Sequence, residues 1–497
     1  MRHEIRFLRR ERLVAVDARH ARMTLLDWLR LDEHCVGTKE GCAEGDCGAC
    51  TVVLARVKNS RVMHQPVNAC ILLLGQVDGA QVITVEDLAA PDGRLHPVQE
   101  AMVRHHGSQC GFCTPGIVMS LFAQHEGGPR PLTRPVVCDQ LAGNLCRCTG
   151  YRPIIDAAME AATLPPVKSR GAAGPEALAA LDDEADILAV DADACAEGNA
   201  AFFAAPRSEA ALVGLLARCP DVQIVAGTTD VGVTITKAMA QPRQIVWLGR
   251  VRGLDQIGVG DGRLSIGAAV TLNDAAADLA KLAPDLGEVV RRFGSVQVRS
   301  CATVGGNIAN GSPIGDLAPC LIALGATLEL AGPQGSRTLP LERFFIAYKH
   351  QDRRPGEYVR RIIVPLPPDN HVFRAYKISK RRDEDISAVL GAFAFVLEGR
   401  RIASARLAFG GMAATPRRAA KTELQARGIG LDDRGTWQAA LAALEQEFTP
   451  MSDHRASAGY RRIVARNLLE KALIELAGAP AGTTRIEPAA EAGHVAG

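Results

Sequence analysis

Residues 41–51 read GCAEGDCGACT, and the first ten of these residues include three cysteines and three glycines. This density of glycine argues against a helix, because each glycine costs about 1 kcal/mol relative to alanine in a helix interior. Glycine also reaches positive φ and lets backbone N–H groups approach a bound group closely. We therefore predict a loop that wraps around a centre held by the thiolates of Cys42, Cys47 and Cys50, and such a centre needs a fourth ligand.

The spacing C-x4-C-x2-C is typical of plant-type ferredoxins, which bind a 2Fe–2S cluster and whose fourth cysteine lies farther along the chain. Cys70 fits that position. A zinc site is the alternative, but zinc loops typically use two pairs of ligands with two to four residues inside each pair. The spacing therefore favours iron and sulfide over zinc.

The residues around this loop alternate between apolar and polar in a way that indicates a small α+β unit. Residues 3–8 and 12–16 are predicted as strands, 23–30 as a helix with Thr24 as its N-cap, and 51–57 as a further strand. Cys35 falls outside the ligand spacing and is interpreted as structural.

A second set of four cysteines follows in SQCGFCTPG (108–116) and GNLCRCTGYRP (143–153). Each pair directly precedes a proline and an apolar-periodic run, so each is predicted to lie at a helix N-terminus, where the helix dipole favours thiolates. Runs 96–106 and 135–144 complete a predicted four-helix unit, with Cys138 in its core. The C-x-C pair suits tetrahedral zinc poorly, which favours a second iron–sulfur cluster. The predicted ligands are Cys110, Cys113, Cys146 and Cys148.

The composition is that of a soluble globular protein of several domains: 497 residues, 47% apolar and 23% charged. Lys plus Arg number 57 and Asp plus Glu 55, so no charge excess indicates a nucleic-acid or membrane partner. The N-terminus lacks the apolar segment of a secretory signal, which favours a cytoplasmic location and metal sites over disulfides. The four scattered later cysteines are interpreted as inert thiols; they are Cys195, Cys219, Cys301 and Cys320.

Two glycine-rich stretches farther along the chain are candidates for phosphate binding. In VQIVAGTTDV (222–231) an apolar strand runs into a Gly-Thr-Thr turn that can offer N–H groups and hydroxyls to a phosphate. This turn is not G-x-G-x-x-G, so a Rossmann site is not indicated. In TVGGN (303–307) the glycines allow the backbone to approach a pyrophosphate, and Asp316 is placed to accept hydrogen bonds from hydroxyl groups.

The tandem of GCAEGDCGAC with Cys70 and of QCGFC with CRC resembles the iron–sulfur half of the molybdenum hydroxylase (xanthine oxidase) family over about residues 1–163. The resemblance implies a β-grasp ferredoxin domain followed by a helical 2Fe–2S domain. It also implies that the helical-domain cluster lies nearer the molybdopterin, with Gln109 and Cys148 facing that cofactor.

Residues 199–480 resemble the flavin domain of the same family, which has the vanillyl-alcohol-oxidase-type FAD fold. The resemblance implies two segments that hold the diphosphate and four further flavin contacts. The expected FAD-binding residues are Ile224, Val225, Ala226, Gly227, Thr228, Thr229, Asp230, Val231, Phe293, Thr303, Val304, Gly305, Gly306, Asn307, Asp316, Val359 and Lys377. The loop KRRDED (380–385) is implied to lie near the flavin and to influence the approach of NAD, although by composition alone it is a solvated charge run.

The expected fold is multidomain α+β, ending in a C-terminal α+β subdomain. Residues 386–399 and 401–412 are predicted as strands and 461–476 as a helix whose core stripe is Val464, Leu468, Ala472 and Leu476. The expected units are a 2Fe–2S ferredoxin domain (1–84), a helical 2Fe–2S domain (85–163), an exposed linker (164–198), an FAD-binding domain (199–370), a C-terminal domain (371–480) and a disordered tail (481–497).

No catalytic triad or zinc-hydrolase motif is present in the sequence, and no catalytic residue is assigned. The resemblance implies an electron-transfer subunit that takes electrons from molybdopterin on a large partner subunit, through two 2Fe–2S clusters, to FAD and then NAD. The fused order of the domains favours the oxidation of hypoxanthine and xanthine to urate, in a hetero-tetramer of two small and two large subunits. Relatives that oxidise aldehydes, N-heterocycles or carbon monoxide with other acceptors are the alternative.

Two further classes of protein stay open. In a regulatory protein the eight cysteines would hold zinc, and a visible absorption spectrum would distinguish this from flavin and iron–sulfur. A recruitment factor for the molybdenum subunit would carry out no electron transfer, and NADH-dependent dye reduction would distinguish it.

Overall fold

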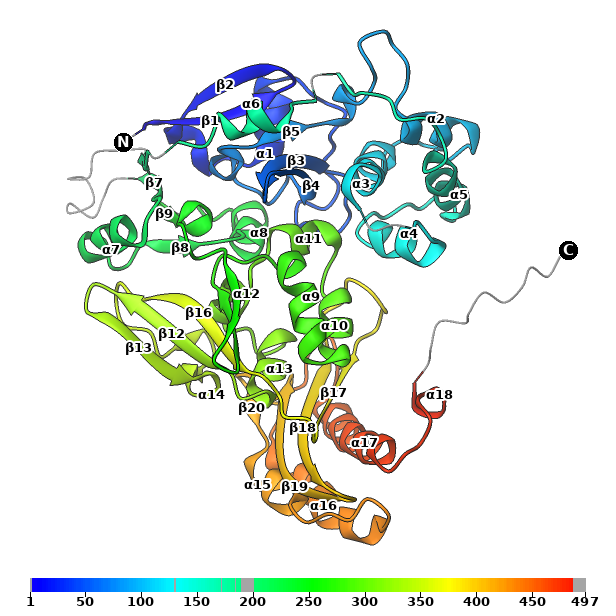
Figure 1. The fold of residues 1–497 in the computed structure, drawn as a ribbon, viewed down its shortest axis with the longest axis vertical. Coiled ribbons are helices and arrows are strands. Elements are labelled where there is room, and N and C mark those ends of the chain that lie inside the picture. Colours follow the sequence, from blue (N-terminus) through cyan, green and yellow to red (C-terminus); the bar gives the residue numbers. More distant parts are fainter. Residues whose placement is uncertain (1, 129–130, 171, 184, 189–200, 486–497) are drawn as a thin grey trace, which may run out of the picture.

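The computed structural model describes residues 2–128, 131–170, 172–183, 185–188 and 201–485. Four units follow one another along the chain (Figure 1): a sheet domain (β1 to η4), a helical domain (α2 to α5), a central domain (β6 to β16) and a C-terminal domain (β17 to α18). The sheet and helical domains lie side by side at one end of the molecule, and the C-terminal domain lies at the other. The fold is multidomain α+β, as predicted.

The sheet domain is a five-stranded sheet in the order β2-β1-β5-β3-β4. The central pair β1 and β5 is parallel and the other neighbours are antiparallel, which is the arrangement of a β-grasp fold. Thr24 accepts a hydrogen bond from the Asp27 N–H and caps a short helix, as predicted. The elements are β1 (Glu4–Arg9), β2 (Arg12–Asp17), η1 (Ala18–Arg22), α1 (Leu25–Asp27), the π-helical turn η2 (Trp28–Asp32), β3 (Thr51–Lys58), β4 (Arg61–Asn68), η3 (Leu74–Val77), β5 (Gln81–Ile83) and η4 (Val85–Asp87).

The helical domain consists of the four predicted helices: α2 (Pro97–Arg104), α3 (Thr114–Gly127), α4 (Arg134–Leu141) and α5 (Arg152–Ala161). Each has a proline in its first two positions, where the fixed φ suits a helix start. One expectation is wrong: Cys138 is exposed, because α4 turns Val137 and Leu141 inward instead.

The segment expected to be an exposed linker is partly structured. It contains α6 (Pro175–Ala179), whose Leu178 is buried, and β6 (Ile187–Leu188), whose Ile187 is buried and which pairs with β7. The expectation of an exposed linker is therefore wrong for these two elements. Residues 171, 184 and 189–198 of the expected linker lie outside the described residues.

The central domain has two larger sheets, the mainly parallel β6-β7-β9-β8 and the antiparallel β10-β11-β16-β12-β13. Helices α9 to α12 lie between the sheet domain and the C-terminal domain (Figure 1), and α12 carries the second segment expected to bind FAD, while the first runs from β8 into α8. The elements are β7 (Phe202–Ala205), α7 (Glu209–Arg218), β8 (Gln223–Val225), α8 (Thr229–Lys237), β9 (Gln244–Trp247), η6 (Leu248–Arg250), β10 (Ile257–Gly260), β11 (Arg263–Gly267), α9 (Leu272–Leu282), α10 (Pro284–Arg291), α11 (Val296–Cys301), α12 (Val304–Asn310), α13 (Leu317–Ala323), β12 (Thr327–Gly332), β13 (Gly335–Pro340), α14 (Leu341–Phe344), β14 (Phe345–Ala347), β15 (His350–Gln351) and β16 (Tyr358–Pro365).

The C-terminal domain packs helices on an antiparallel sheet, β17-β18-β19-β20. Leu468, Ala472 and Leu476 of the predicted stripe are buried, and Val464 packs against the same core. The elements are β17 (His371–Ile378), β18 (Val389–Glu398), β19 (Arg401–Gly410), β20 (Arg417–Arg418), α15 (Ala420–Ala426), η7 (Arg434–Trp437), α16 (Gln438–Glu447), α17 (Ala458–Leu476) and α18 (Ala481–Thr484). The expected tail therefore begins with a short helix, and its residues 486–497 lie outside the described residues.

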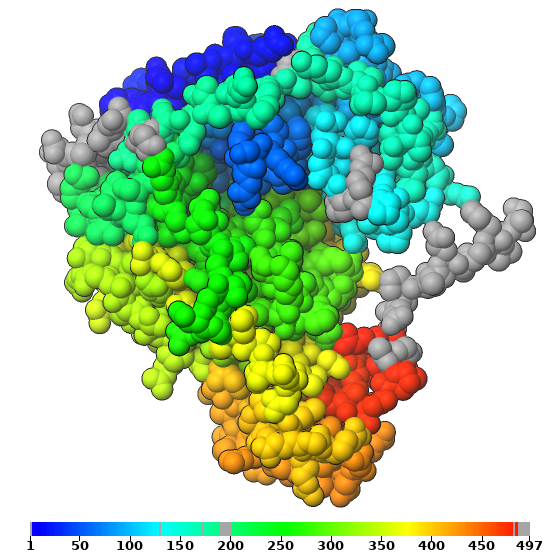
Figure 2. Space-filling model, viewed as in Figure 1, coloured from blue at the N-terminus to red at the C-terminus, as the bar shows by residue number. Residues whose placement is uncertain are grey.

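The sheet domain is seated on the central domain with little space between them (Figure 2). Asp78 is 1% exposed and sits between two arginines: Arg2 binds it through two hydrogen bonds of 2.9 and 2.8 Å, and Arg250 of the central domain lies 3.5 Å away. The two domains also touch through their backbones: a Cβ on Gly232 of α8 would lie 2.3 Å from the Ile71 carbonyl oxygen. Within the described residues, no helix combines the length and apolar character needed to span a bilayer.

Candidate functional site

The loop 41–50 brings the first four thiols together. The Cys50 and Cys70 sulfurs lie 3.3 Å apart, and the Cys42 sulfur accepts hydrogen bonds from the N–H groups of Glu44, Asp46 and Cys47 at 3.5, 3.4 and 3.3 Å. Gly45 and Gly48 have φ of +80° and +69°, values that favour glycine. Backbone N–H groups directed at sulfur suit the anionic sulfurs of an iron–sulfur centre, so the residues present fit that group.

Protonation within this set is shared between neighbouring thiols. The Cys47 thiol donates to Cys42 and, with the backbone N–H groups, lowers the pKa of Cys42 to about 5. The proximity of Cys50 and burial raise the pKa of Cys70. Four thiolates this close together repel one another unless a cation lies between them. The set therefore has the properties of metal ligands, which bind as thiolates.

The second set of thiols is also assembled, at the starts of two helices. Cys113 is the N-cap of α3 and its thiol lies within hydrogen-bonding reach of that of Cys146, as the Cys110 thiol does of that of Cys148, and all four thiols are free. The Tyr151 hydroxyl accepts a hydrogen bond from the Cys146 N–H at 2.8 Å. Cys110 and Cys148 are exposed, whereas Cys113 and Cys146 are half-buried, so the set opens toward solvent on one side.

The two thiol sets are linked by a single backbone hydrogen bond. The Leu145 N–H donates to the Cys47 carbonyl at 3.0 Å, and Leu145 directly precedes Cys146. The approach is close: a Cβ on Gly48 would lie 2.0 Å from the Gly143 carbonyl oxygen, and a Cβ on Gly116 would lie 2.1 Å from that of Gly48. The sheet and helical domains therefore hold their cysteines in a fixed relation.

The first segment expected to bind FAD runs from β8 into α8. Thr228 precedes α8 with φ of 57°, and its hydroxyl bonds to the Gln76 side chain and to the Ile71 carbonyl, so it docks the turn on the sheet domain beside Cys70. Sequence reasoning expected that hydroxyl to face a phosphate. A Cβ on Gly227 would lie 2.1 Å from the Cys301 carbonyl oxygen, so glycine is required here for backbone packing.

The second segment expected to bind FAD forms the start of α12. The N–H groups of Val304, Gly305 and Gly306 donate to Val270 O, Ala268 O and Thr303 Oγ1, respectively. A Cβ on Gly306 would lie 3.9 Å from that of Ala226, so the structure brings the two segments together. Gly306 itself presents no side chain toward Ala226, and this fits a ligand that lies close to the backbone.

Of the remaining expected FAD contacts, Asp316 and Lys377 meet directly. The Lys377 Nζ lies 2.6 Å from Asp316 Oδ2, and the Ser387 hydroxyl donates to Oδ1 at 2.5 Å, with all three residues buried. Each carboxylate oxygen retains one further lone pair for a ligand hydroxyl. Val359 is buried in the core of the central domain, and Phe293 packs against the same core.

The loop 380–385 is folded rather than freely solvated. Asp385 accepts from the N–H groups of Lys380 and Arg381 at 2.8 and 2.9 Å, and the Arg292 guanidinium donates to the Arg382 carbonyl at 2.9 Å. Burial, reinforced by the charge of Asp46, raises the pKa of Glu384 to about 8. The loop therefore reaches Asp46, between Cys42 and Cys47, as well as Arg292, which directly precedes Phe293.

The other cysteines have separate environments. Cys35 is buried and accepts a hydrogen bond from Arg9 at 3.2 Å, in agreement with a structural role. Cys301 and Cys320 are free thiols whose pKa values are raised by burial, that of Cys301 to about 12. Cys219 is disulfide-bonded, so the expectation of a free thiol is wrong there, and Cys195 lies outside the described residues.

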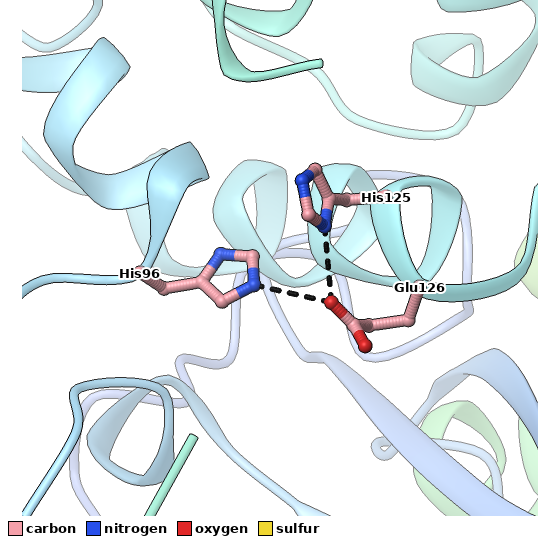
Figure 3. Close-up of side chains that lie close together, drawn as sticks. All are labelled: His96, His125 and Glu126. Atoms are coloured by element: carbon pink, nitrogen blue, oxygen red, sulfur yellow. Dashed lines mark hydrogen bonds and ion pairs between the residues drawn. The ribbon is translucent and has the colours of Figure 1, made fainter. Parts of the chain in front are cut away.

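Sequence reasoning missed a cluster of His96, His125 and Glu126 (Figure 3). The Glu126 carboxylate lies 3.3 Å from His96 Nε2 and 3.0 Å from His125 Nδ1. These atoms have the composition of a metal site, but His96 Nδ1 accepts a 3.3 Å hydrogen bond from the Val98 N–H. The proton of a neutral His96 therefore lies on Nε2, where it donates to Glu126. The cluster ties the start of α2 to the end of α3.

Glu126→Gln is expected to destabilise the chain by about 1 kcal/mol, because it weakens the hydrogen bonds from His96 and His125 at a side chain that is 34% exposed and partly screened by solvent. The hydrogen bonds from His125 and His96 lower the pKa of Glu126. Its contribution is therefore present above the pKa of the unfolded carboxyl and is lost as the pH falls below it.

Urea unfolding of the wild type and of this variant at pH 7 and pH 4 measures the effect, with the difference shrinking at the lower pH. Glu100→Gln is the matched control, since Glu100 pairs with Arg104 on the surface of the same domain. An equal loss in both variants would contradict the prediction.

Comparison with known proteins follows the domain order. Residues 84–159 match a [2Fe-2S] binding domain, residues 198–367 the FAD binding domain in molybdopterin dehydrogenase, and residues 374–476 the CO dehydrogenase flavoprotein C-terminal domain. The chain therefore carries 2Fe–2S-binding and FAD-binding domains.

Among relatives, xanthine dehydrogenase of Oryza sativa subsp. japonica is 33% identical over 81% of this chain and 34% of its own length. Xanthine dehydrogenase of Emericella nidulans is 32% identical over 89% of this chain and 36% of its own length. The chain thus spans about a third of the length of the curated relatives it matches.

Among solved structures, CO dehydrogenase from Oligotropha carboxidovorans aligns with a TM-score of 0.51 and 28% identity, over 54% of this chain and 94% of that chain. Quinoline 2-oxidoreductase from Pseudomonas putida 86 aligns with a TM-score of 0.51 and 25% identity, over 55% and 95%. The domain content and these relatives together support an iron–sulfur and FAD subunit similar to those of the molybdenum hydroxylase family.

Proposed function

We propose that this chain is the electron-transfer small subunit of a xanthine dehydrogenase. It would receive electrons from a molybdopterin centre on a large partner subunit and deliver them to NAD during the oxidation of hypoxanthine and xanthine to urate. The observation that carries the proposal is the continuity of the site. The second thiol set is joined to the first by one backbone hydrogen bond, and the first adjoins the segments expected to bind FAD.

The exposure of the two thiol sets supports this direction of electron flow. Cys110 and Cys148 lie at the surface, beside Phe112 and Leu145, which are 47% and 45% exposed. Cys50 and Cys70 are buried, and Ile71, next to Cys70, contacts the turn at Thr228. A donor on another chain has access to the second thiol set, whereas the first set lies inside, toward the flavin segments.

Each group of residues would hold a different cofactor. Cys42, Cys47, Cys50 and Cys70 would hold one cluster, and Cys110, Cys113, Cys146 and Cys148 the other. When bound, the clusters supply one-electron carriers and the flavin supplies the two-electron chemistry of hydride transfer. The FAD contacts would be residues 224–231 and 303–307 with Phe293, Asp316, Val359 and Lys377.

A related molybdenum hydroxylase with another substrate or acceptor is the second candidate, because CO dehydrogenase and quinoline 2-oxidoreductase share the fold. The relatives named xanthine dehydrogenase favour the first, since their similarity extends across 81% and 89% of this chain.

The test is to purify the chain with its native partner, weigh the assembly and assay hypoxanthine and xanthine with NAD. We expect urate and NADH in equal amounts from xanthine, two small and two large subunits in the assembly, and NADH-dependent bleaching of flavin in the isolated chain. Turnover of an aldehyde or N-heterocycle without NAD reduction would favour the second candidate. A colourless chain that contains zinc would exclude both.

A further inference from the structure

A buried amide of the central domain lies where three domains meet. Gln297, on α11, is 1% exposed, and its Nε2 lies within hydrogen-bond distance of one group of the sheet domain and two of the helical domain. These are Thr51 Oγ1 at 3.2 Å, Ser120 Oγ at 3.0 Å and Asn144 Oδ1 at 2.9 Å. Thr51 follows the ligand position Cys50, and Asn144 lies two residues before Cys146.

The hydrogen-bond network around Gln297 requires a hydrogen-bond donor at the position of its Nε2 atom. The Thr51 hydroxyl donates its hydrogen bond to the Gly48 carbonyl at 2.7 Å, and the Ser120 hydroxyl donates to Asn144 Oδ1 at 2.6 Å. All three groups therefore present lone pairs toward Gln297. The amide N–H groups of Gln297 satisfy acceptors from two domains, while its own Oε1 is buried without a partner.

The Gly143 backbone packs directly against the side chains of Ser295 and Gln297. A Cβ on Gly143 would lie 2.2 Å from Ser295 Cβ and 2.5 Å from Gln297 Oε1. The Asn144 amide donates to the Gly48 carbonyl at 3.2 Å. Gln297 is thus hydrogen-bonded to Thr51, next to the first thiol set, and to Asn144, next to the second. It also lies four residues after Phe293, an expected flavin contact.

We propose that Gln297 is the positioning residue that holds the two cysteine loops and the flavin-bearing domain in register. Its amide ties Thr51, beside the first thiol set, to Asn144, beside the second, and anchors both to α11. The proposal rests on the cluster assignment only for its electronic consequence. The mechanical role is a property of the polypeptide and is measured with or without iron.

Two variants and one matched control test it. Gln297→Glu keeps the size but directs a carboxylate at three acceptors, and Gln297→Met keeps the volume without donors or charge. Gln140→Glu is the control, because Gln140 is also buried and donates to the Ser120 carbonyl at 2.9 Å, but makes that bond within the helical domain. It repeats the chemistry without crossing a domain boundary.

Hydrogen exchange of the full chain is the first measurement. In Gln297→Met, amides of residues 48–51 and 143–145 should exchange about tenfold faster, because opening loses hydrogen bonds that joined the domains. Gln140→Glu should accelerate exchange only in α3 and α4. Wild-type protection of both loops in Gln297→Met would overturn the proposal, even if Gln297→Glu fails to fold.

Electron paramagnetic resonance of the dithionite-reduced chain is the second measurement. We expect full iron content in both Gln297→Met and Gln140→Glu, with a weakened spin–spin interaction between the clusters in the former only. An unchanged interaction together with unchanged exchange would assign Gln297 to passive packing. A wild-type chain without two clusters would refute the proposed function instead, and the exchange result would still decide the role of Gln297.

Discussion

Cys148→Ser is expected to abolish one of two iron–sulfur signals in electron paramagnetic resonance and to leave the other unchanged. Cys148 is exposed and its free thiol lies within hydrogen-bonding reach of that of Cys110, on the open side of the second set. Serine does not supply the thiolate that iron prefers, so this cluster should be lost together with about half of the iron. The first set lies in another domain with its own core and should keep its cluster.

The matched control is Cys138→Ser, because Cys138 is also exposed in the helical domain but belongs to neither thiol set. Both signals should persist in that variant. Loss of both signals in Cys148→Ser would show that the two ligand sets are wrongly divided.

Gly306→Val is expected to abolish FAD binding while the chain stays folded. The new Cβ would lie 2.9 Å from Thr303 Oγ1, a side-chain atom that can rotate, and 3.9 Å from Ala226 Cβ. The valine methyl groups would extend into the gap between the two segments expected to hold the diphosphate. Flavin content per chain should fall by about tenfold or more, which is the effect of an interaction worth 1.4 kcal/mol or more.

Gly214→Val on α7 is the control, because a Cβ there meets nothing within 4 Å. It introduces the same side chain into a helix away from the expected site and should retain flavin. Full flavin content in Gly306→Val, measured by absorbance after denaturation, would contradict the assignment of residues 303–307.

Local patterns in the sequence predicted what depends on neighbouring residues. The prolines at the starts of α3 and α5 placed Cys113 and Cys146 near helix N-termini, and the Thr24 cap was visible from its spacing to Asp27. Such features need only the residues within one turn of a helix. The order of the domains followed in the same way, from two cysteine spacings and two glycine-rich stretches.

Contacts between domains could not be predicted in this way. The Thr228 hydroxyl bonds to residues 152 and 157 positions earlier, and Gln297 bonds to a residue 246 positions earlier. Leu178 and Ile187 are buried although their segment is rich in alanine and acidic residues, because other domains cover them. Cys138 was misplaced since the inward face of an eight-residue helix is set by its neighbours.

The glycine contacts between the cysteine loops have a kinetic consequence. Gly48, Gly116 and Gly143 lie so close together that no methyl group fits between them. Under the proposed function, the two clusters would therefore stay at a fixed separation during electron transfer. Electron transfer between the two clusters should therefore be insensitive to solvent viscosity and should persist in a glycerol glass. Electron transfer to an acceptor that must diffuse to the protein should stop in the same glass.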